Sequence, residues 1–412
     1  MFSVDNFYDY LSVSYGFPEK NNIFYKFNDN GGRDLYSLSA ITHDDRFLRK
    51  YCGAALLFDQ EPFDLDLYQF DINTTRNLKN HKIYEKYLTK LEMLQIYFSS
   101  LRPTLLCHSE LYSNDIKNAT DNGFIDVYYW YHGLIARDWF RHWKHYKVKN
   151  TNKKRFGIYI RDAGHYRSYR ISILEKLSLI NYNVHFEIQE TLASQLSSDL
   201  RSTWPLATHA VNSDASATIT WADTEKFNIH LVAETQFDTN KVHLTEKIFK
   251  PMVMRQPFIL FAGPGSLKTL KKYGFKTFDS LWDESYDNII DNSTRLESII
   301  SLINSLSELP ELEFNQLLEK ATDIVNYNHQ HFYSQKFEDI LLSELNDNFK
   351  NALQQQEDQY HSNPGGNWLS QVDQLYQKSG VVVNKEWINS VVATIPNSST
   401  KTKILKKYGH LF

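Results

Sequence analysis

The residues best suited to bind an anion in this sequence are Thr245, Glu246 and Lys247, which open an expected helix. The free backbone N–H groups of a first helical turn, together with the helix dipole, attract a phosphate group. A capping threonine adds a hydroxyl donor, and the lysine adds a positive charge for a diphosphate. Glu246 either stabilises the dipole or accepts hydrogen bonds from ribose hydroxyls. Because Thr-Glu-Lys also opens many ordinary helices, the three residues alone do not define a site.

The elements around this helix start favour a nucleotide site at the edge of a parallel sheet. An apolar run, HLVA, ends in Glu234, and the helix leads to a second apolar run at 257–261 and then to a glycine turn. Strand, acidic loop, helix start, strand and glycine-rich turn are typical, in this order, of a site at the C-terminal edge of such a sheet. We therefore expect the site to be bordered by Glu234, Thr245, Glu246, Lys247, Gly263 and Gly265.

A basic loop, RDAGHYRSYR, follows another expected strand at 156–160 and places three arginines between aromatic residues. Arg161 and Arg167 are explained equally well as solvated charges of a loop. Arg170 stands at the start of an expected helix (171–179), where an anion would meet the first turn. We therefore predict that Arg170 belongs to the site and that Arg161 contributes to it.

The order of these groups resembles the donor site of the α-1,3-fucosyltransferase-like family. In that family a strand and acidic loop precede Thr-Glu-Lys, a helix and a Pro-initiated strand that ends in glycine. An arginine also starts a helix whose leucine falls seven residues later, as Leu177 follows Arg170 here. Over about residues 150–280, the resemblance implies that Arg170 and Lys247 bind the donor diphosphate and that Glu246 binds the ribose. The loop at 234–236 lacks the asparagine and serine of fucosyltransferases, so the resemblance indicates transfer more firmly than it indicates fucose.

The chain is also similar to a group of tailed-phage glycosyltransferases that share DQEP, HSE, YYWYHG with ARDW, and LTEK with FKP. These motifs extend from about residue 55 to about residue 335. The similarity makes a hydroxymethylated DNA base one expected acceptor, and a surface glycan is the other.

Inversion at an anomeric carbon needs a general base beside the acceptor hydroxyl, and a carboxylate with a raised pKa suits this role. Glu61 ranks first because it follows a short apolar strand, as the base of the fucosyltransferases does, and Asp59 ranks second. Glu110, His108 and His132 are further acceptor-side candidates. Each has a structural alternative, because carboxylates are common in turns before proline and lone histidines are usually structural.

Two further patterns carry weaker signals. Asp64 and Asp66 form a D-x-D pair that can chelate a metal, but such pairs arise easily by chance, and we predict that no metal is required. The strip 137–155 interleaves basic residues with Trp and Tyr, so it either contacts nucleic acid or forms the solvated face of a helix that leads into a linker. There is no Walker-type glycine loop.

Runs typical of buried strands, at 52–58, 103–107, 125–130, 156–160 and 183–188, alternate with helical segments. At 412 residues the chain is too long for one typical core. We predict an α/β fold with two Rossmann-like domains of the GT-B type, in which donor and acceptor meet between the domains. The predicted limits are 1–150 for the acceptor side, 151–345 for the nucleotide-sugar donor and 346–412 for a C-terminal helical tail.

The composition gives no indication of a strongly basic nucleic-acid-binding protein, a disulfide-rich protein or a membrane-spanning protein. With 45 basic and 49 acidic residues, the chain gives no overall charge argument for nucleic acid. Cys52 and Cys107 lie in apolar runs and are expected to be buried, reduced thiols. We expect neither a secretory signal nor a membrane span, because no apolar segment approaches about 18–20 residues.

These observations predict a cytoplasmic glycosyltransferase, in the host cytoplasm if the gene is a phage gene. It moves a sugar from a UDP- or GDP-type donor to a hydroxyl acceptor, with inversion and without a metal or other cofactor. The alternative is a non-enzymatic nucleic-acid-binding or virion-associated protein that retains the fold.

Overall fold

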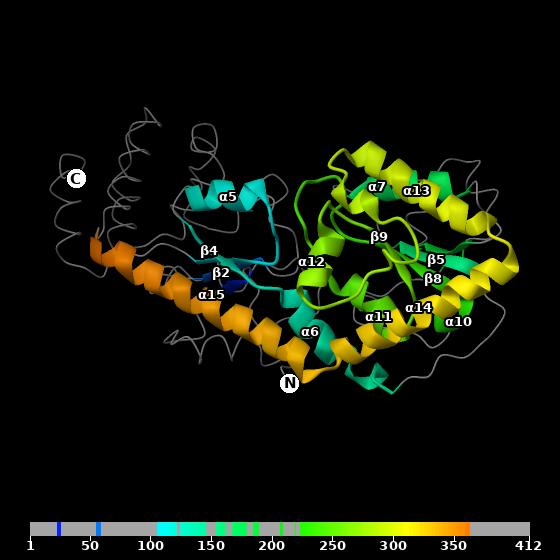
Figure 1. Ribbon diagram of the computed structural model, residues 1–412. Coiled ribbons are helices and arrows are strands. Elements are labelled where there is room, and N and C mark those ends of the chain that lie inside the picture. Colours follow the sequence, from blue (N-terminus) through cyan, green and yellow to red (C-terminus); the bar gives the residue numbers. More distant parts are fainter. Residues whose placement is uncertain are drawn as a thin grey trace, which may run out of the picture. The chain divides into compact units, whose positions relative to one another are not determined.

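The computed structural model describes residues 23–25, 55–58, 105–121, 124–145, 154–160, 163, 167–178, 184–188, 207–208, 219 and 223–362. The chain divides into two compact units, each described here by itself (Figure 1). In the described part of the chain, unit 1 holds Ser109–Ser113 and Trp130–Ser343, and unit 2 holds the residues before and between these segments and those from Glu344 onward. Each unit contains one parallel sheet, so the predicted α/β class is confirmed.

The sheet of unit 1 has the strand order β7-β6-β5-β8-β9. Its strands are β5 (Lys154–Ile160), β6 (Val184–Ile188), β7 (Ala207–Thr208), β8 (Phe227–Ala233) and β9 (Phe258–Phe261). The chain starts at the central β5, moves outward to β7, and then returns to the other side of β5 as β8. All neighbouring pairs are parallel. This is the order of a Rossmann-like sheet, and its direction reverses between β5 and β8.

Strands β8 and β9 are mostly apolar because this side of the sheet lies in the core. All four residues of β9 are buried, and so are all residues of β8 except Asn228. Such continuous apolar strands are typical of parallel sheets that are covered on both faces. In β5, a Cβ at Gly157 would lie 1.9 Å from the ring of Phe227. Glycine is therefore required there for β8 to pack closely against β5.

The described part of unit 1 contains α-helices and short 3-10 helices. They are α6 (Tyr131–Trp139), η3 (Arg141–Trp143), α7 (Tyr169–Ser178), α10 (Asp223–Lys226), η7 (Glu246–Ile248), α11 (Phe249–Met254), α12 (Ser266–Lys272), η8 (Ser285–Asn288), α13 (Asn292–Glu308), α14 (Glu311–Phe332) and the first part of α15 (Gln335–Ser362). Asp291 caps α13 by accepting a hydrogen bond from the Thr294 N–H at 2.8 Å.

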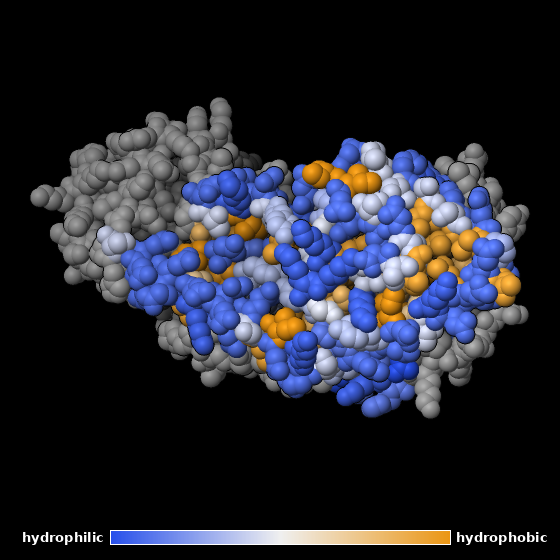
Figure 2. Space-filling model, in the orientation of Figure 1, coloured by the Kyte–Doolittle hydropathy of each residue, from blue (hydrophilic) through white to orange (hydrophobic). Residues whose placement is uncertain are grey.

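The view in Figure 2 shows a mostly hydrophilic surface over the described residues, with an apolar area between α13 and α14. A shallow groove in this area is lined by Leu302, Leu306, Leu309 and Leu317.

The described sheet of unit 2 has the order β1-β2-β3-β4, with all neighbours parallel. Its strands are β1 (Ile23–Tyr25), β2 (Ala55–Phe58), β3 (Leu105–His108) and β4 (Ile125–Tyr128), and α5 (Asn114–Asp121) joins β3 to β4. The later part of α15 packs on this sheet, since the Asn348 side chain donates to Tyr128 O at 2.7 Å and Phe349 contacts the Tyr129 ring. The helical character of the segment after residue 345 is thus confirmed up to Ser362.

The units do not follow the predicted sequence limits. Residues 109–113 and 130–145 fall in unit 1, although they precede residue 150. Long-range contacts explain this: Leu111 and Val242 exchange two backbone hydrogen bonds of 2.9 Å, and Trp130 Nε1 donates to Leu244 O at 2.9 Å. At the other end, α15 runs as one helix through residue 345. Among the described residues, no helix combines the length and apolar character that crossing a membrane requires.

Candidate functional site

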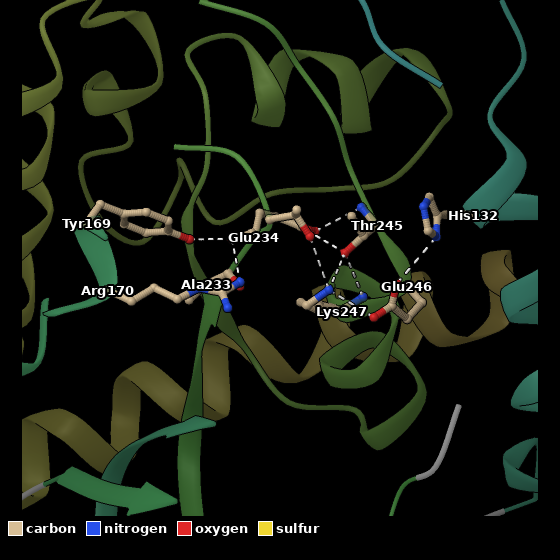
Figure 3. Close-up of polar contacts among 9 residues, drawn as sticks. His132, Tyr169, Arg170, Ala233, Glu234, Thr245, Glu246 and Lys247 are labelled. Carbon is tan, nitrogen blue, oxygen red and sulfur yellow. Dashed lines mark hydrogen bonds and ion pairs between the residues drawn. The ribbon is translucent and has the colours of Figure 1, made fainter. Parts of the chain in front are cut away.

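A buried carboxylate, Glu234, directly follows β8 and faces the start of η7 (Figure 3). Its Oε1 accepts a hydrogen bond from the Thr245 N–H at 3.1 Å, and its Oε2 accepts one from Thr245 Oγ1 at 2.5 Å. The side chain is fully buried, and this burial raises the pKa of Glu234 although Lys247 and Thr245 act in the opposite direction. The Glu234 carboxylate therefore accepts hydrogen bonds from the Thr245 N–H and hydroxyl at the helix start, which were expected to bind an anion.

The helix start itself is formed as the sequence predicts. Thr245 is the N-cap, and its Oγ1 accepts a hydrogen bond from the Lys247 N–H at 3.4 Å. Lys247 Nζ lies 2.9 Å from Glu246 Oε1, 3.1 Å from Thr245 Oγ1 and 3.4 Å from Thr235 Oγ1. The Lys247 side chain is 31% exposed, so its charge is held at the cluster but still reaches solvent.

Glu246 lies between two basic side chains. Its Oε1 contacts Lys247, and its Oε2 lies 3.4 Å from Nδ1 of His132, which belongs to α6 (Figure 3). Burial opposes ionisation of this carboxylate, but Lys247 and His132 outweigh the burial and hold the pKa of Glu246 well below its ordinary value. Glu246 is therefore an ionised hydrogen-bond acceptor in a buried setting.

Three more residues complete a buried polar cluster. The bridge between Leu111 and Val242 places Glu110 beside Lys241, with Glu110 Oε1 3.2 Å from Lys241 Nζ and both side chains buried. His243 packs edge-to-face against His132, with ring centroids 5.5 Å apart. Burial, followed by the positive charges of its neighbours, lowers the pKa of His243 well below its ordinary value, which keeps the ring neutral.

This polar cluster consists of Glu110, His132, Glu234, Lys241, His243, Thr245, Glu246 and Lys247, all within unit 1. It brings together three motifs that lie far apart in the sequence: HSE, YYWYHG and LTEK. Lys241 and His243 were not predicted from the sequence. In the sequence they are marked only by their position just before LTEK. Their role becomes visible only when the bridge between Leu111 and Val242 places Lys241 beside Glu110.

Arg170 lies in the first turn of α7, at a helix start as expected, but its side chain is buried. One terminal nitrogen donates to Ala233 O at 3.1 Å and to Glu234 O at 2.8 Å, and the Tyr169 hydroxyl also donates to Glu234 O. The Tyr169 ring stacks on Phe237 at 4.8 Å. In this structure Arg170 therefore joins the start of α7 to the end of β8.

The glycine turn is explained by backbone packing. A Cβ at Gly263 would lie 2.2 Å from Lys241 O, so only glycine permits this close approach. Gly265 has a φ of 80°, and its N–H donates to Asp287 O at 2.7 Å. The carboxylate of Asp287 accepts from the Leu267 and Lys268 N–H groups, at 2.9 and 3.0 Å, and so caps α12. These contacts account for both glycines without a ligand.

Two groups of predicted residues have other roles. His108 belongs to unit 2, where its Nε2 lies 2.6 Å from Asp126 Oδ1, so it is not part of the polar cluster. In the strip 137–155, Arg137 donates to Phe332 O, Ser334 O and Glu338, and Arg155 donates to Leu306 O, Ser307 O and Glu311. Both proposed interpretations of the strip are therefore wrong for these two arginines, which hold the ends of α13, α14 and α15.

Some predicted residues lie outside the described part of the chain: Cys52, Asp59, Glu61, Asp64, Asp66 and Arg161. Cys107 is buried, as expected. Among the described residues, no group of three or more His, Cys, Asp or Glu side chains is arranged to hold a metal ion.

No protein-family model matches the chain, and no curated protein matches it. Among solved structures, a T4 phage BGT mutant in complex with UDP-glucose is similar, with 14% identity and a TM-score of 0.40, over 80% of this chain and 82% of that one. T4 phage BGT in complex with UDP and Mn²⁺ is similar at the same identity and TM-score, over 78% of this chain and 82% of that one.

Proposed function

We propose that this protein is a glycosyltransferase that binds a nucleoside diphosphate sugar in unit 1 and transfers the sugar to a hydroxyl acceptor. The observation that carries the proposal is the reversal of strand order between β5 and β8, with Lys247 and Glu246 directly beyond the C-terminal end of β8. Ligands of open parallel sheets bind at this end of the strands, where the order reverses.

The polar cluster supplies the groups that such a donor needs. Lys247 is partly exposed and carries a positive charge that can stabilise the diphosphate as it leaves. Glu246 is buried and ionised, so it can accept hydrogen bonds from the ribose hydroxyls. Glu234 holds Thr245, and thereby the helix start, in place through two hydrogen bonds. In this proposal Arg170 acts through Glu234 by fixing the end of β8.

The proposed acceptor chemistry uses a carboxylate as general base and proceeds with inversion. Glu61 is the first candidate and Asp59 the second, on the sequence argument given above. Glu110 is less suited because its buried side chain is paired with Lys241. In other transferases a metal ion stabilises the negative charge of the leaving diphosphate. Here the positive charge of Lys247 would do so, and the proposed reaction therefore needs no metal. The acceptor is either a hydroxymethylated DNA base or a glycan.

Isothermal titration with UDP and with GDP tests the donor site. We expect Lys247→Met to weaken binding at least about tenfold, or about 1.4 kcal/mol. Lys271→Met is the matched control, because Lys271 also pairs with a carboxylate, Asp279, at 2.8 Å, but lies on α12 outside the polar cluster. Its affinity should equal that of the wild type.

The proposal fails if neither nucleotide binds and no sugar nucleotide in a panel of donors is hydrolysed. Transfer of labelled sugar to hydroxymethylated duplex DNA, compared with oligosaccharides, then identifies the acceptor. Salt-dependent DNA binding that is unchanged by Lys247→Met, without any transfer, would instead support a non-enzymatic nucleic-acid-binding protein.

A further inference from the structure

Two buried histidines lie side by side in the polar cluster. His132 and His243 are 3% and 2% exposed, and their rings meet at an interplanar angle of 89°. Nδ1 of His132 faces Glu246 Oε2 at 3.4 Å. None of the described residues forms a hydrogen bond with Nε2 of His132 or with either ring nitrogen of His243.

This arrangement is unfavourable for the fold alone. A neutral imidazole carries one N–H donor and one acceptor nitrogen, and buried polar atoms are almost always hydrogen-bonded in folded proteins. Leaving such atoms unsatisfied costs free energy, whereas an apolar ring of similar shape would not. A phenylalanine at position 243 would fill the same space more favourably. The nitrogen atoms of His243 are therefore better explained by a ligand than by packing.

The charges around the pair select the kind of ligand. Glu110 faces Lys241, and Glu246 faces Lys247, so the basic side chains nearest the pair already contact carboxylates. Glu234 lies in the same cluster, hydrogen-bonded to Thr245. An anion placed at the imidazole nitrogens themselves, rather than at the partly exposed Lys247, would lie beside the ionised Glu246 and be repelled by it. A neutral group that donates and accepts a hydrogen bond matches the imidazole atoms, and a hydroxyl is such a group.

We propose that His132 and His243 form a subsite for the hydroxyl groups of a sugar ring. The proposal rests on the proposed function, because it places a sugar beside Lys247 and Glu246. Two rings of the donor offer such hydroxyls, the ribose of the nucleotide and the transferred sugar. His243 binds the hydroxyls directly, and His132 binds through Nε2 while its Nδ1 faces Glu246.

Thermal unfolding of the full-length protein, with and without ligand, tests this subsite. The probes are UDP, which carries only the ribose, and UDP-glucose, UDP-galactose and GDP-fucose, which carry both rings. For His243→Phe we expect a melting temperature at or above that of the wild type without ligand. The increase in melting temperature that ligand produces in the wild type should be lost, with at least tenfold weaker binding by titration.

Two variants control for changes in folding. His243→Gln keeps a donor and an acceptor, so it should retain part of the ligand-induced increase. His230→Phe is the matched control, because His230 is also a buried, neutral histidine, with its pKa lowered to about 3 by burial. It packs against the rings of Tyr159 and Phe227 and is not part of the polar cluster, so its ligand response should equal that of the wild type.

The outcomes separate the two proposals. Loss of the response to the sugar nucleotides alone places the hydroxyls on the transferred sugar, and loss of the response to UDP as well places them on the ribose. A wild type that responds, with a His243→Phe variant that responds equally, overturns the subsite and leaves the proposed function standing. A wild type that responds to none of the probes overturns both.

Discussion

Replacing Thr245 by valine should show how strongly the helix start depends on Glu234. Valine has nearly the shape of threonine but lacks the hydroxyl. The change removes the 2.5 Å hydrogen bond to Glu234 Oε2 and the contacts of Oγ1 with the Lys247 N–H and Nζ. Among the described residues, the Glu234 carboxylate then keeps only the 3.1 Å hydrogen bond from the Thr245 N–H.

The expected cost follows from these contacts. A hydrogen bond to a charged group contributes about 1.5–3 kcal/mol. Loss of a threonine N-cap costs typically about 1 kcal/mol, and part of this overlaps with the first loss because the same hydroxyl makes both contacts. We expect Thr245→Val to reduce the free energy of unfolding by about 2–4 kcal/mol at pH 7. Thr245→Ser keeps the hydroxyl and should cost much less.

The loss should also depend on pH, because burial raises the pKa of Glu234 above its unfolded value and loss of a donor raises it further. For a carboxyl group shifted in this direction, stability is full below the unfolded pKa of about 4.3 and is lost as pH rises through the folded pKa. The difference between wild type and Thr245→Val should therefore grow as pH rises and shrink toward acid pH.

Urea unfolding followed by tryptophan fluorescence measures these differences. Thr269→Val is the matched control: Thr269 is a buried threonine whose hydroxyl donates to a neutral acceptor, Gly265 O, at 2.9 Å. A neutral hydrogen bond contributes about 1 kcal/mol, without dependence on the titration of Glu234. The reasoning is refuted if Thr245→Val costs no more than Thr269→Val, or if its cost is the same at every pH.

The remaining predictions concern charged side chains and metal dependence. As pH rises, Glu234→Gln should become more stable relative to the wild type, and Glu246→Gln should become less stable relative to it. The lowered pKa of Glu246 means that its contribution to stability is present above about pH 4.3 and is lost on acidification. Urea unfolding at several pH values should therefore show that the stability differences of the two variants change with pH in opposite directions. Arg170→Met should reduce the free energy of unfolding by about 2–4 kcal/mol because two buried carbonyls lose a donor. Lys247→Met should reduce it by about 1.5–3 kcal/mol, because the buried carboxylate of Glu246 loses a charged hydrogen-bond donor and keeps only His132 beside it. Sugar transfer should survive dialysis against EDTA without stimulation by Mn²⁺, and an activity that returns only with metal would contradict the proposed mechanism.

Local patterns were sufficient to predict the elements of the fold. Continuous apolar runs predicted β3 and β9, in which every residue is buried. Less uniform runs predicted β4, β5 and β6, which also contain polar residues such as Asp126 and Glu187. Thr245 was predicted as a helix cap because a hydroxyl there satisfies a backbone N–H of the first turn, and the structure confirms it.

Contacts between distant segments could not be predicted in this way. The pairing of Glu110 with Lys241 depends on a single bridge between segments more than a hundred residues apart, and nothing in either segment specifies it. The position of Arg170 beside the end of β8 follows from the order of strands. Whether its guanidinium meets a ligand or the carbonyls of Ala233 and Glu234 depends on how closely α7 approaches β8, which no spacing in the sequence records.

The balance of charge in the polar cluster constrains how a diphosphate can bind. Lys241 neutralises Glu110 and Lys247 neutralises Glu246, so no described cation of the cluster lies without a carboxylate contact. An incoming diphosphate must therefore take Lys247 from Glu246. Lys247 can make this exchange because its side chain reaches solvent, whereas Lys241 is buried. Glu246 then keeps His132 as its neighbour at 3.4 Å. Because of His132, the buried Glu246 carboxylate still has a partner after Lys247 has moved to the diphosphate. Lys247 can therefore pair with Glu246 in the free protein and with the diphosphate when the donor is bound.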